Sequence, residues 1–382
     1  MRFLFVVPPL TGHINPTISV ARALEARGHE VAWVGHPGKV RPLLPAGARL
    51  FTLPEDATAD HAARVQDKAA TTRGAAALKF LWEDFLVPLA RSMKPGIAAA
   101  VDEFAPDVMC CDQQAVAGGL VARARNLKWA TLATTSAGIS DPLGALPQVK
   151  KWFEDLIGEL EREAGLPRAG ELSPHLVIAF TTSALVPGTF PAHYKLVGPS
   201  IADRPETTPF PFDQLTRPCV LVSMGTVNAD QSGRFYAITV EALADQPYQV
   251  VLVAPPELVP RTPANFLVQR YVPQLALLSH VDAVVCHGGH NTTCEALAHG
   301  LPLAIAPIKD DQPIVADQVV AAGAGVRLKF GRVQSPELCE AVARLLADPT
   351  LRAGAARVRD SFAAAGGATK AAEHLEALGV KA

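Results

Sequence analysis

Charge of either sign is scarce in this sequence, and neither sign is in excess. Charged residues make up 19% of the 382 residues, and 35 Lys and Arg against 37 Asp and Glu give a formal net charge of -2. A chain without a basic excess or a Lys/Arg block lacks the electrostatic footprint of a nucleic-acid or membrane-surface binder. No apolar run is long enough to cross a bilayer, and the N-terminal MRFLFVVPPL shows no secretory cleavage site. These absences predict a soluble cytoplasmic protein.

Three short motifs that would indicate a metal, redox or dinucleotide site are also missing. The six cysteines form no C-x-x-C pair, so we expect buried free thiols in a reducing compartment. No D-x-D pair is present, so we expect no divalent cation and no other cofactor. No G-x-G-x-x-G follows the opening strand of either half of the chain, which argues against a nicotinamide dehydrogenase.

What the sequence does contain is one pattern of elements that occurs twice. An apolar strand, a turn, a helix and a second strand follow one another in each half. These segments are residues 2–7, 11–16, 17–27 and 29–34, and then 219–224, 225–226, 235–244 and 249–254. Each β-α-β unit predicts an open parallel sheet with helices on both faces. With 49% hydrophobic residues the chain can fill two such cores, so we predict an α/β protein with two doubly wound domains.

A proline-rich segment separates the two halves. Residues 201–218, IADRPETTPFPFDQLTRP, contain four prolines and few apolar residues, which is typical of a linker. We therefore predict a first domain at 1–200, a linker at 201–217 and a second domain at 218–382. The last helix of the chain could pack back on the first domain.

The most informative segment is residues 271–318. It contains an apolar strand at 281–286, a His-Gly-Gly loop that opens a helix, and a second strand that ends in Asp-Asp-Gln. Glycines between a strand and a helix let the backbone approach an anion, and the helix N-terminus supplies N–H groups with a partial positive charge. We expect Gly289 and His287 to hold a diphosphate there, with Asn291 and Thr292 as candidate N-caps.

Residues beside this loop could bind the base and ribose of a nucleotide. Tyr271 could stack on a base, although a packed turn residue is the alternative. Val272 could offer its backbone to the base edge, and Gln274 its amide to the base or ribose. Glu295 could accept bonds from ribose hydroxyls, or simply complement the helix dipole.

Two further positions at strand ends extend the candidate site. Asp311 and Gln312 follow the strand at 301–307, and a carboxylate beside an amide suits sugar hydroxyls. Ser223 and Thr226 follow the first strand of the second half, and their hydroxyls could reach the phosphates. Solvated loop residues are the alternative for the first pair, and plain turn residues for the second.

In the first half, one histidine stands at the end of the opening strand. His13 lies in the loop that leaves this strand, where an imidazole with a pKa near neutrality could remove a proton from a hydroxyl. A general base needs an orienting partner, and Asp112 at the exit of the strand 107–112 is the candidate. Polar surface is the alternative for His13.

Aromatic residues of the first half could line an apolar pocket. They are Phe80, Trp82, Phe85, Trp152 and Phe153, within segments 55–100 and 141–172. Ordinary amphipathic helices packed on the sheet are the other interpretation, and both can hold for different faces.

On these residues the chain resembles the family 1 inverting glycosyltransferases, the UDP-glycosyltransferase superfamily. Residues 271–318 are similar to the family signature, which commonly begins with Trp where this chain has Tyr271, and PPLTGHINP at 8–16 looks like its acceptor-base motif. Two departures are His290 in place of the Trp of plant members and Val315 in place of a frequent Asn. The motifs look particularly like the bacterial macrolide and carotenoid branches, and the single His before Gly-Gly is closer to UDP-sugar than to TDP-deoxysugar users.

The resemblance implies the GT-B fold, with two Rossmann-like domains facing a central cleft. It implies His13 as base, Asp112 as its partner, and Tyr271 on uracil. It places Gln274 and Glu295 at the ribose, His287, Asn291 and Thr292 on the phosphates, and Asp311 and Gln312 on the hexose. The predicted reaction moves a hexose, with glucose as the first candidate, from a UDP-sugar to an apolar small molecule such as a polyketide, macrolide, aromatic or carotenoid, with inversion.

Other functions remain open from the sequence alone. They are a UDP-sugar epimerase of the same fold, a TDP-deoxysugar transferase, and a nucleotide-sugar binding protein without turnover. A homodimer is a further possibility, and the sequence names neither the acceptor nor the attacking atom.

Overall fold

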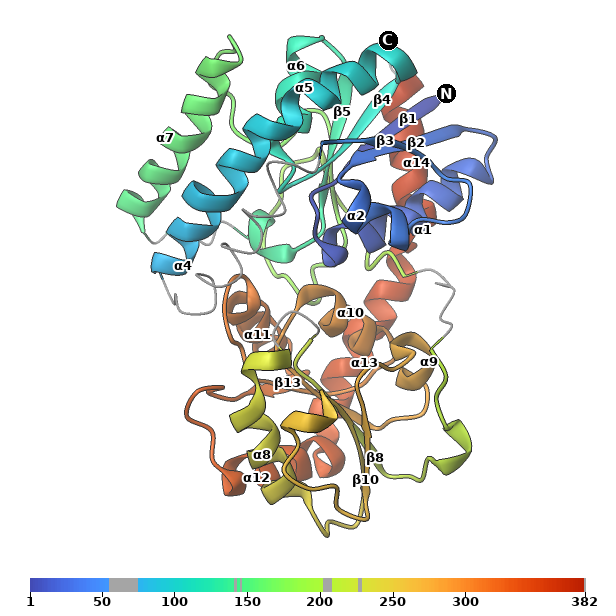
Figure 1. Cartoon of the computed structure of the whole chain (residues 1–382), viewed down its shortest axis with the longest axis vertical. Coiled ribbons are helices and arrows are strands. Elements are labelled where there is room, and N and C mark those ends of the chain that lie inside the picture. Colours follow the sequence, from blue (N-terminus) through green and yellow to red (C-terminus); the bar gives the residue numbers. More distant parts are fainter. Residues whose placement is uncertain (55–74, 141–142, 145, 202–207, 226–228, 381–382) are drawn as a thin grey trace. The chain divides into compact units, whose positions relative to one another are not determined.

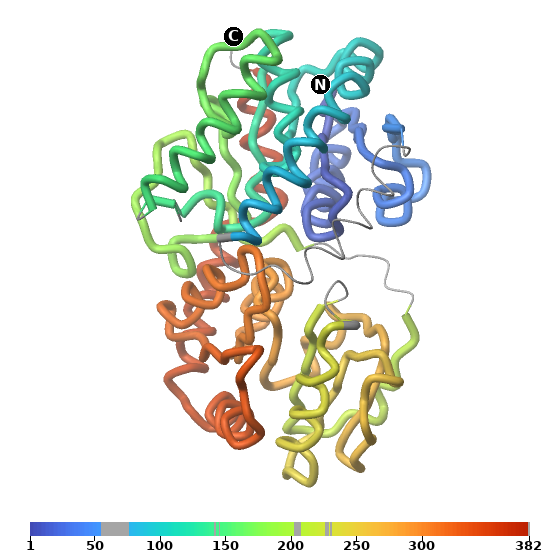
Figure 2. Tube along the Cα trace, turned by 60° about the vertical axis from the view of Figure 1, so that its left-hand side comes forward, coloured from blue at the N-terminus to red at the C-terminus, as the bar shows by residue number. Residues whose placement is uncertain are grey.

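The chain forms two compact units in a computed structural model that describes residues 1–54, 75–140, 143–144, 146–201, 208–225 and 229–380. The first unit comprises Met1–Thr181, Gly188–Ala202 and Ala365–Ala382, and the second comprises Thr182–Pro187 and Asp203–Ala364. Figures 1 and 2 show that the red C-terminal segment returns to the unit that the blue N-terminal segment begins.

The described part of the first unit contains a parallel sheet of seven strands. They are β1 (Arg2–Val6), β2 (Glu30–Gly35), β3 (Arg49–Thr52), β4 (Val108–Asp112), β5 (Lys128–Ala133), β6 (Val177–Ala179) and β7 (Tyr194–Leu196). Their order is β3-β2-β1-β4-β5-β6-β7. Strands β2 and β3 follow β1 on one side of the sheet, and β4 to β7 follow one another on the other side. The strand order therefore reverses between β1 and β4. Their carboxyl ends form a topological switch point, where open α/β sheets bind ligands.

Helices cover both faces of this sheet. They are α1 (Thr11–Glu25), α2 (Pro37–Val40), α4 (Ala75–Phe80), α5 (Val87–Phe104), α6 (Val116–Ala124), α7 (Pro147–Glu163) and α14 (Gly367–Val380), with a π-helical turn at Leu81–Leu86. Helices α5 and α6 pack together on one face, and α1 and α14 pack together on the other (Figure 1).

The alternation of side chains along β1 explains why both faces are covered. Leu4 and Val6 lie in the apolar cluster under α5 and α6, whereas Phe3, Phe5 and Val7 lie in the cluster under α1 and α14. Successive side chains of a strand point to opposite faces. An unbroken apolar run therefore needs a helix layer on each side.

The second unit repeats this architecture. Its strands are β8 (Cys219–Ser223), β9 (Gln249–Val253), β10 (Phe266–Gln269), β11 (Ala283–Cys286), β12 (Leu303–Ile305) and β13 (Gly325–Arg327), in the parallel order β10-β9-β8-β11-β12-β13. Its helices are α8 (Gly233–Leu243), α9 (Gln274–Leu278), α10 (His290–Ala298), α11 (Gln312–Ala321), α12 (Ser335–Ala347) and α13 (Pro349–Ala365). The switch point of this sheet lies between β8 and β11.

Short 3-10 turns complete the two units. They cover Arg41–Leu43, Ser136–Ile139, Phe212–Gln214, Ala229–Gln231 and Pro256–Leu258. Within the described ranges, no helix is both long and apolar enough to span a bilayer.

The start of α1 differs from the prediction. The sequence pattern predicted a turn at 11–16, but the helix begins at Thr11 and contains Pro16. The amides of His13 and Ile14 both donate to the carbonyl of Leu10, at 2.9 and 3.1 Å, and so start the helix early. Pro16 removes one backbone donor from the second turn of the helix, yet the helix continues to Glu25. His13 consequently lies in the first turn of a helix rather than in a loop.

The thiols are as expected from the sequence. Five of the six cysteines are buried, Cys339 is half-buried, and all six are free.

Candidate active site

His13 and Asp112 meet at the switch point of the first sheet. Asp112 is the last residue of β4, and His13 lies in the first turn of α1, the helix that follows β1. Strands β1 and β4 pair in parallel, with Val6 opposite Cys111, so their carboxyl ends lie at the same edge. The Nδ1 atom of His13 is 3.0 Å from Oδ1 and 3.1 Å from Oδ2 of Asp112. The carboxylate is fully buried, while the imidazole is 15% exposed.

The Asp112 carboxylate is held by two other donors. The backbone N–H of Gln114 donates to Oδ1 at 2.8 Å, and the hydroxyl of Thr134 donates to Oδ2 at 2.6 Å. The Thr134 Oγ1 atom is also 2.7 Å from Nδ1 of His13. A buried carboxylate needs such hydrogen-bond partners in place of water. The arrangement therefore fixes the carboxylate beside the imidazole.

The aromatic residues proposed for an apolar pocket divide into two groups. Phe80 and Phe85 are 7% and 8% exposed and contribute to the core, which favours the packing interpretation for these two. Trp82 and Phe153 are half-buried and meet edge to face, with ring centroids 4.6 Å apart. The indole N–H of Trp152 donates to Glu83 at 2.9 Å.

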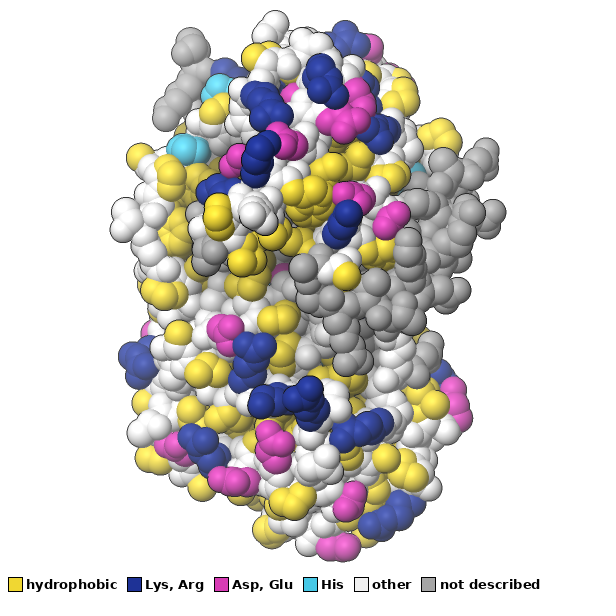
Figure 3. All heavy atoms as spheres, turned by 90° about the vertical axis from the view of Figure 1, so that its left-hand side faces the viewer, with side chains coloured by type: hydrophobic (Ala, Val, Ile, Leu, Met, Phe, Trp, Pro, Cys, Tyr) yellow, Lys and Arg dark blue, Asp and Glu magenta, His cyan; other side chains and the backbone are white. Residues whose placement is uncertain are grey.

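The face that carries α4, α5 and α7 has apolar surface. Figure 3 shows exposed hydrophobic side chains there between groups of paired ionic side chains. The ionic groups include Arg91 with Glu159 and Glu163, at 3.2 and 2.7 Å. Trp82, Trp152 and Phe153 are all half-buried, and Trp82 and Phe153 also pack against the core under α5 and α6, so both interpretations stay open for these residues.

In the second unit, His287 lies at the corresponding switch point. It directly follows β11, whose Cys286 pairs with Ser223 at the end of β8. The imidazole is enclosed by two glycines: a Cβ added to Gly225 would lie 2.7 Å from its Cε1 atom, and one added to Gly289 would lie 2.6 Å from its Nε2 atom. Gly225 also has a φ of +73°, which favours glycine. Both positions thus need glycine for the ring to lie where it does.

Burial keeps His287 neutral. Desolvation lowers its pKa to about 4, against smaller upward contributions from the Asp311 charge and the Ser223 backbone. Its Nδ1 atom is buried and has no hydrogen-bond partner among the described residues. At neutral pH the imidazole can donate or accept a hydrogen bond, but it does not bring a positive charge of its own. The expected contact between His287 and a diphosphate would therefore be a hydrogen bond rather than an ion pair.

Helix α10 begins before its predicted caps. Its N-cap is Gly289, and no capping hydrogen bond from a side chain is formed. Asn291 and Thr292, predicted as caps, lie inside the first turn, because the helix begins at His290. A helix that starts on glycine presents its first amides without a capping side chain over them, which is the arrangement of an anion-binding helix end.

Gln274, Thr292 and Glu295 come together beside this helix end. The Gln274 amide donates to Glu295 Oε2 at 2.5 Å and lies 3.5 Å from the Thr292 hydroxyl. Glu295 is only 5% exposed. Gln274 begins α9 and Glu295 lies in the second turn of α10, so two short helices present a carboxylate and an amide side by side. Such a pair can bind adjacent hydroxyl groups.

Tyr271 is exposed. It is 59% accessible, one of the few large hydrophobic side chains of the described residues with that much exposure. This excludes the packed-turn alternative and leaves a ring face available for stacking. Val272 is half-buried directly before Pro273, the N-cap of α9.

Asp311 and Gln312 lie at the start of α11, after β12. Asp311 is the N-cap residue and Gln312 is the first residue of the helix. The Gln312 side-chain oxygen accepts the backbone N–H groups of Ile308 and Lys309, at 2.8 and 3.1 Å. This oxygen shapes the loop before α11, so the NH₂ side of the amide is the part suited to a ligand. Thr226 lies outside the described residues.

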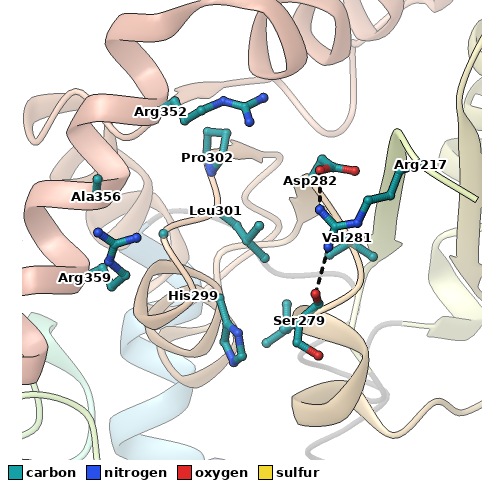
Figure 4. Close-up of a pocket in the computed structure, with 12 residues that line it drawn as sticks. Arg217, Ser279, Val281, Asp282, His299, Leu301, Pro302, Arg352, Ala356 and Arg359 are labelled. Atoms are coloured by element: carbon teal, nitrogen blue, oxygen red, sulfur yellow. Dashed lines mark hydrogen bonds and ion pairs between the residues drawn. The ribbon is translucent and has the colours of Figure 1, made fainter.

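A pocket of about 440 Å³ lies elsewhere in the second unit, near the amino ends of β8, β11 and β12 (Figure 4). Three arginines line it, but each has protein partners. Arg217 contacts Asp282 at 2.9 Å and the Ser279 carbonyl at 2.8 Å, Arg359 contacts Asp360 at 2.9 Å, and Arg352 donates to the Leu346 carbonyl at 3.0 Å. Because ligands of open α/β sheets bind at the carboxyl ends of the strands, we assign this pocket no role in the site.

Metal ligands are not grouped in the part of the chain that the structure describes: no three His, Cys, Asp or Glu side chains lie close enough to hold an ion. The expectation of a reaction without metal remains a prediction.

Thr134 is a side chain at the His13–Asp112 pair that the sequence analysis did not identify. It follows β5, the neighbour of β4, and is 3% exposed. A threonine after an apolar strand is common. Only the strand order, which the sequence does not display, brings it to the same edge as His13 and Asp112.

Known proteins share this architecture and much of the sequence. Residues 239–378 match the C-terminal domain of the family described as erythromycin biosynthesis protein CIII-like. The 4'-demethylrebeccamycin synthase of Lentzea aerocolonigenes is 31% identical over 99% of both chains. The demethyllactenocin mycarosyltransferase of Streptomyces fradiae is 30% identical, over 98% of this chain and 86% of that one.

A solved structure agrees with these relatives. The glycosyltransferase of kitacinnamycin matches with a TM-score of 0.79 and 25% identity, over 99% of this chain and 98% of that one. The two parallel-sheet Rossmann-like units are those of the GT-B fold. The similarity extends along nearly the whole chain, and it includes proteins named for glycosyl transfer. This chain is an enzyme of the family 1 GT-B glycosyltransferases, in the natural-product branch.

Proposed function

We propose that the protein transfers a hexose from a nucleoside diphosphate sugar to a hydroxyl of an apolar small molecule, with inversion at the anomeric carbon. The observation that carries this proposal is the hydrogen bond between His13 and the buried Asp112, 3.0 Å long, at the switch point of the first sheet. A base oriented by a carboxylate fits deprotonation of a hydroxyl.

In the proposed reaction, His13 Nε2 takes the proton of the acceptor hydroxyl. The oxygen forms a bond to the anomeric carbon, while the bond between that carbon and the diphosphate breaks and its electron pair leaves with the diphosphate. Asp112 stabilises the imidazolium that forms. One displacement gives inversion, so an α-linked donor yields a β-glycoside.

The second unit supplies what the departing diphosphate requires. The amino end of α10, with Gly289 as its cap, and the neighbouring His287 are proposed to bind the phosphates. Ser223 adds a hydroxyl at the end of β8. Gln274 and Glu295 suit the ribose, because they form a carboxylate-amide pair within hydrogen-bonding range.

The remaining candidate residues are proposed to bind the base, the hexose and the acceptor. The exposed ring of Tyr271 is proposed to stack on the base, beside the Val272 backbone. Asp311 and Gln312 are proposed to bind the hexose hydroxyls. Trp82 and Phe153 are the aromatic residues we propose for the apolar acceptor.

UDP-glucose is the first donor to test. The single histidine before Gly-Gly favours a UDP-sugar, as the family pattern implies. A TDP-deoxysugar is the second candidate, and it is favoured by the relative named for transfer of a mycarosyl group. Relatives named for glycosyl transfer support a transferase over an epimerase or a binding protein without turnover.

A donor-by-acceptor screen tests the proposal. UDP-glucose, other UDP-hexoses and TDP-deoxysugars are incubated with macrolides, polyketides, carotenoids and phenols, and products are identified by mass spectrometry. A glycoside is expected, and NMR of the product should show the anomeric configuration opposite to that of the donor. A retained configuration, or an altered donor sugar without a glycoside, contradicts the proposed reaction.

The role of His13 is tested with His13→Gln. We expect kcat to fall by about 10²- to 10⁴-fold, the usual contribution of a general base. The Kd of the nucleoside diphosphate, measured by calorimetry, should stay unchanged, since the proposed donor-binding residues belong to the second unit. Near-normal turnover in this variant would remove His13 from the mechanism.

A further inference from the structure

We infer that Thr134 is a positioning residue that fixes His13 in the tautomer with hydrogen on Nδ1, so that Nε2 is the basic nitrogen. This inference rests on the proposed role of His13 as general base. It concerns a residue that the sequence motifs do not single out.

The hydroxyl of Thr134 lies between the two partners. Its oxygen is 2.6 Å from Oδ2 of Asp112 and 2.7 Å from Nδ1 of His13. The residue is 3% exposed, so water cannot readily replace these bonds. Three adjacent strands, β1, β4 and β5, bring the three side chains to one edge of the sheet.

The hydrogens that Asp112 and Thr134 can donate determine the tautomer of His13. An ionised Asp112 has no hydrogen to give, and the Thr134 hydroxyl has one. A hydrogen bond to a charged acceptor is stronger than one to a neutral acceptor, so this hydrogen points to the carboxylate. The Thr134 oxygen then presents a lone pair to Nδ1, as does the carboxylate. Nδ1 of His13 therefore faces two acceptors, the Thr134 oxygen and the Asp112 carboxylate, and must itself carry a hydrogen.

The hydroxyl also fixes the orientation of the carboxylate. The Gln114 amide holds Oδ1 at 2.8 Å while Thr134 holds Oδ2, and the two oxygens end up nearly equidistant from Nδ1, at 3.0 and 3.1 Å. Without Thr134, Oδ2 would lose its hydroxyl donor in a buried environment, and the carboxylate could turn about its remaining contacts. The ring would then lose the environment that selects the Nδ1–H form.

Thr134→Val and Thr134→Ser test the inference together. Valine keeps the shape and removes the hydroxyl, whereas serine keeps the hydroxyl. We expect Thr134→Val to lower kcat about tenfold, the loss of one hydrogen bond to a charged group, and to leave the donor KM within about twofold. Thr134→Ser should remain near the wild type. The matched control is Thr239→Val, which removes a buried hydroxyl that donates to the Phe235 carbonyl inside α8, and it should not change kcat.

A second readout does not depend on turnover. In protein labelled with ¹⁵N-histidine, the nitrogen shifts of His13, assigned by comparison with His13→Gln, report its tautomer. Wild type and Thr134→Ser should show hydrogen on Nδ1, and Thr134→Val should show a smaller fraction of that form. Thermal unfolding of each variant confirms that it is folded.

Three results would overturn the inference. They are an unchanged tautomer in Thr134→Val, a loss in Thr134→Ser as large as in Thr134→Val, or a raised donor KM with unchanged kcat, which would place the hydroxyl on the substrate instead. If the wild type forms no glycoside with any donor, the proposed function fails, while the tautomer measurement still decides the role of Thr134.

Discussion

At the scale of single residues, His287, which we propose binds the diphosphate, lies in an environment that disfavours its charged form. Its ring is enclosed by Gly225 and Gly289, and burial lowers its pKa to about 4. A histidine that stays neutral when folded but takes up a proton when unfolded opposes folding in acid, because the unfolded state then binds more protons. The site thus has a cost in stability below neutral pH.

This cost can be measured with His287→Gln. The free energy of unfolding of the second unit should fall as the pH drops from the unfolded-state value of 6.5 towards 4, and the decrease between pH 7 and pH 5 should be roughly 2 kcal/mol larger in the wild type than in the variant. Urea titrations at the two pH values give this difference. Equal decreases in both proteins would show that His287 is protonated in the folded state.

At the scale of elements, the start of α10 is the place where we propose that the diphosphate binds. Gly289 caps the helix with a φ of -59°, so its backbone does not require glycine. The space beside it does, because a Cβ there would come within 2.6 Å of the His287 ring. The helix end and the imidazole are therefore packed against each other.

Gly289→Ala tests this packing. The added methyl group should displace the His287 ring and raise the Kd of UDP or TDP roughly tenfold, the value of one hydrogen bond to a charged group. Isothermal titration calorimetry measures the effect. Gly233→Ala at the start of α8 is the matched control, because nothing lies within 4 Å of its added Cβ. A change of similar size in both variants would point to a general cost of alanine rather than to contact with His287.

The sequence predicted the positions of strands better than the starts of helices. Where an apolar run predicted a strand, it placed that strand within two residues, because burial on both faces leaves a distinct pattern, as at 219–224 for β8. Strands β3, β5, β6, β7 and β13 were not predicted. Helix starts were placed less well: Gly12 and Pro16 looked like a turn but lie inside α1. The His13–Asp112 pair followed from strand ends, whereas Thr134 needed the strand order. Turn signals report local preference, and tertiary contacts override it.

At the scale of the whole molecule, the last helix belongs to the first unit. Helix α14 packs on α1, and Glu376 pairs with Arg27 and His29 at 2.7 and 2.6 Å. Its apolar face contributes Ala371, Ala372 and Leu375 to the core under α1. Helix α14 thus completes the unit that holds His13.

Leu375→Ala should accordingly weaken the first unit alone. Removing a fully buried leucine costs about 2–5 kcal/mol, and hydrogen exchange monitored by mass spectrometry should show lower protection in peptides from β1 and α1. Leu345→Ala in α12, equally buried in the core of the second unit, is the matched variant and should lower protection in β8 and α12 instead. Lower protection of both units in either variant would contradict this division.

The route of the chain has a practical consequence for building hybrid enzymes. Since residues from Ala365 onward return to the first unit, the second unit is an insertion within the first rather than a C-terminal half. A hybrid joined once, in the proline-rich segment, would pack a foreign α14 onto the native α1. Exchange of donor specificity between homologues should therefore use two junctions and graft the cassette from about Asp203 to Ala364, leaving the native terminal helix on its own partner.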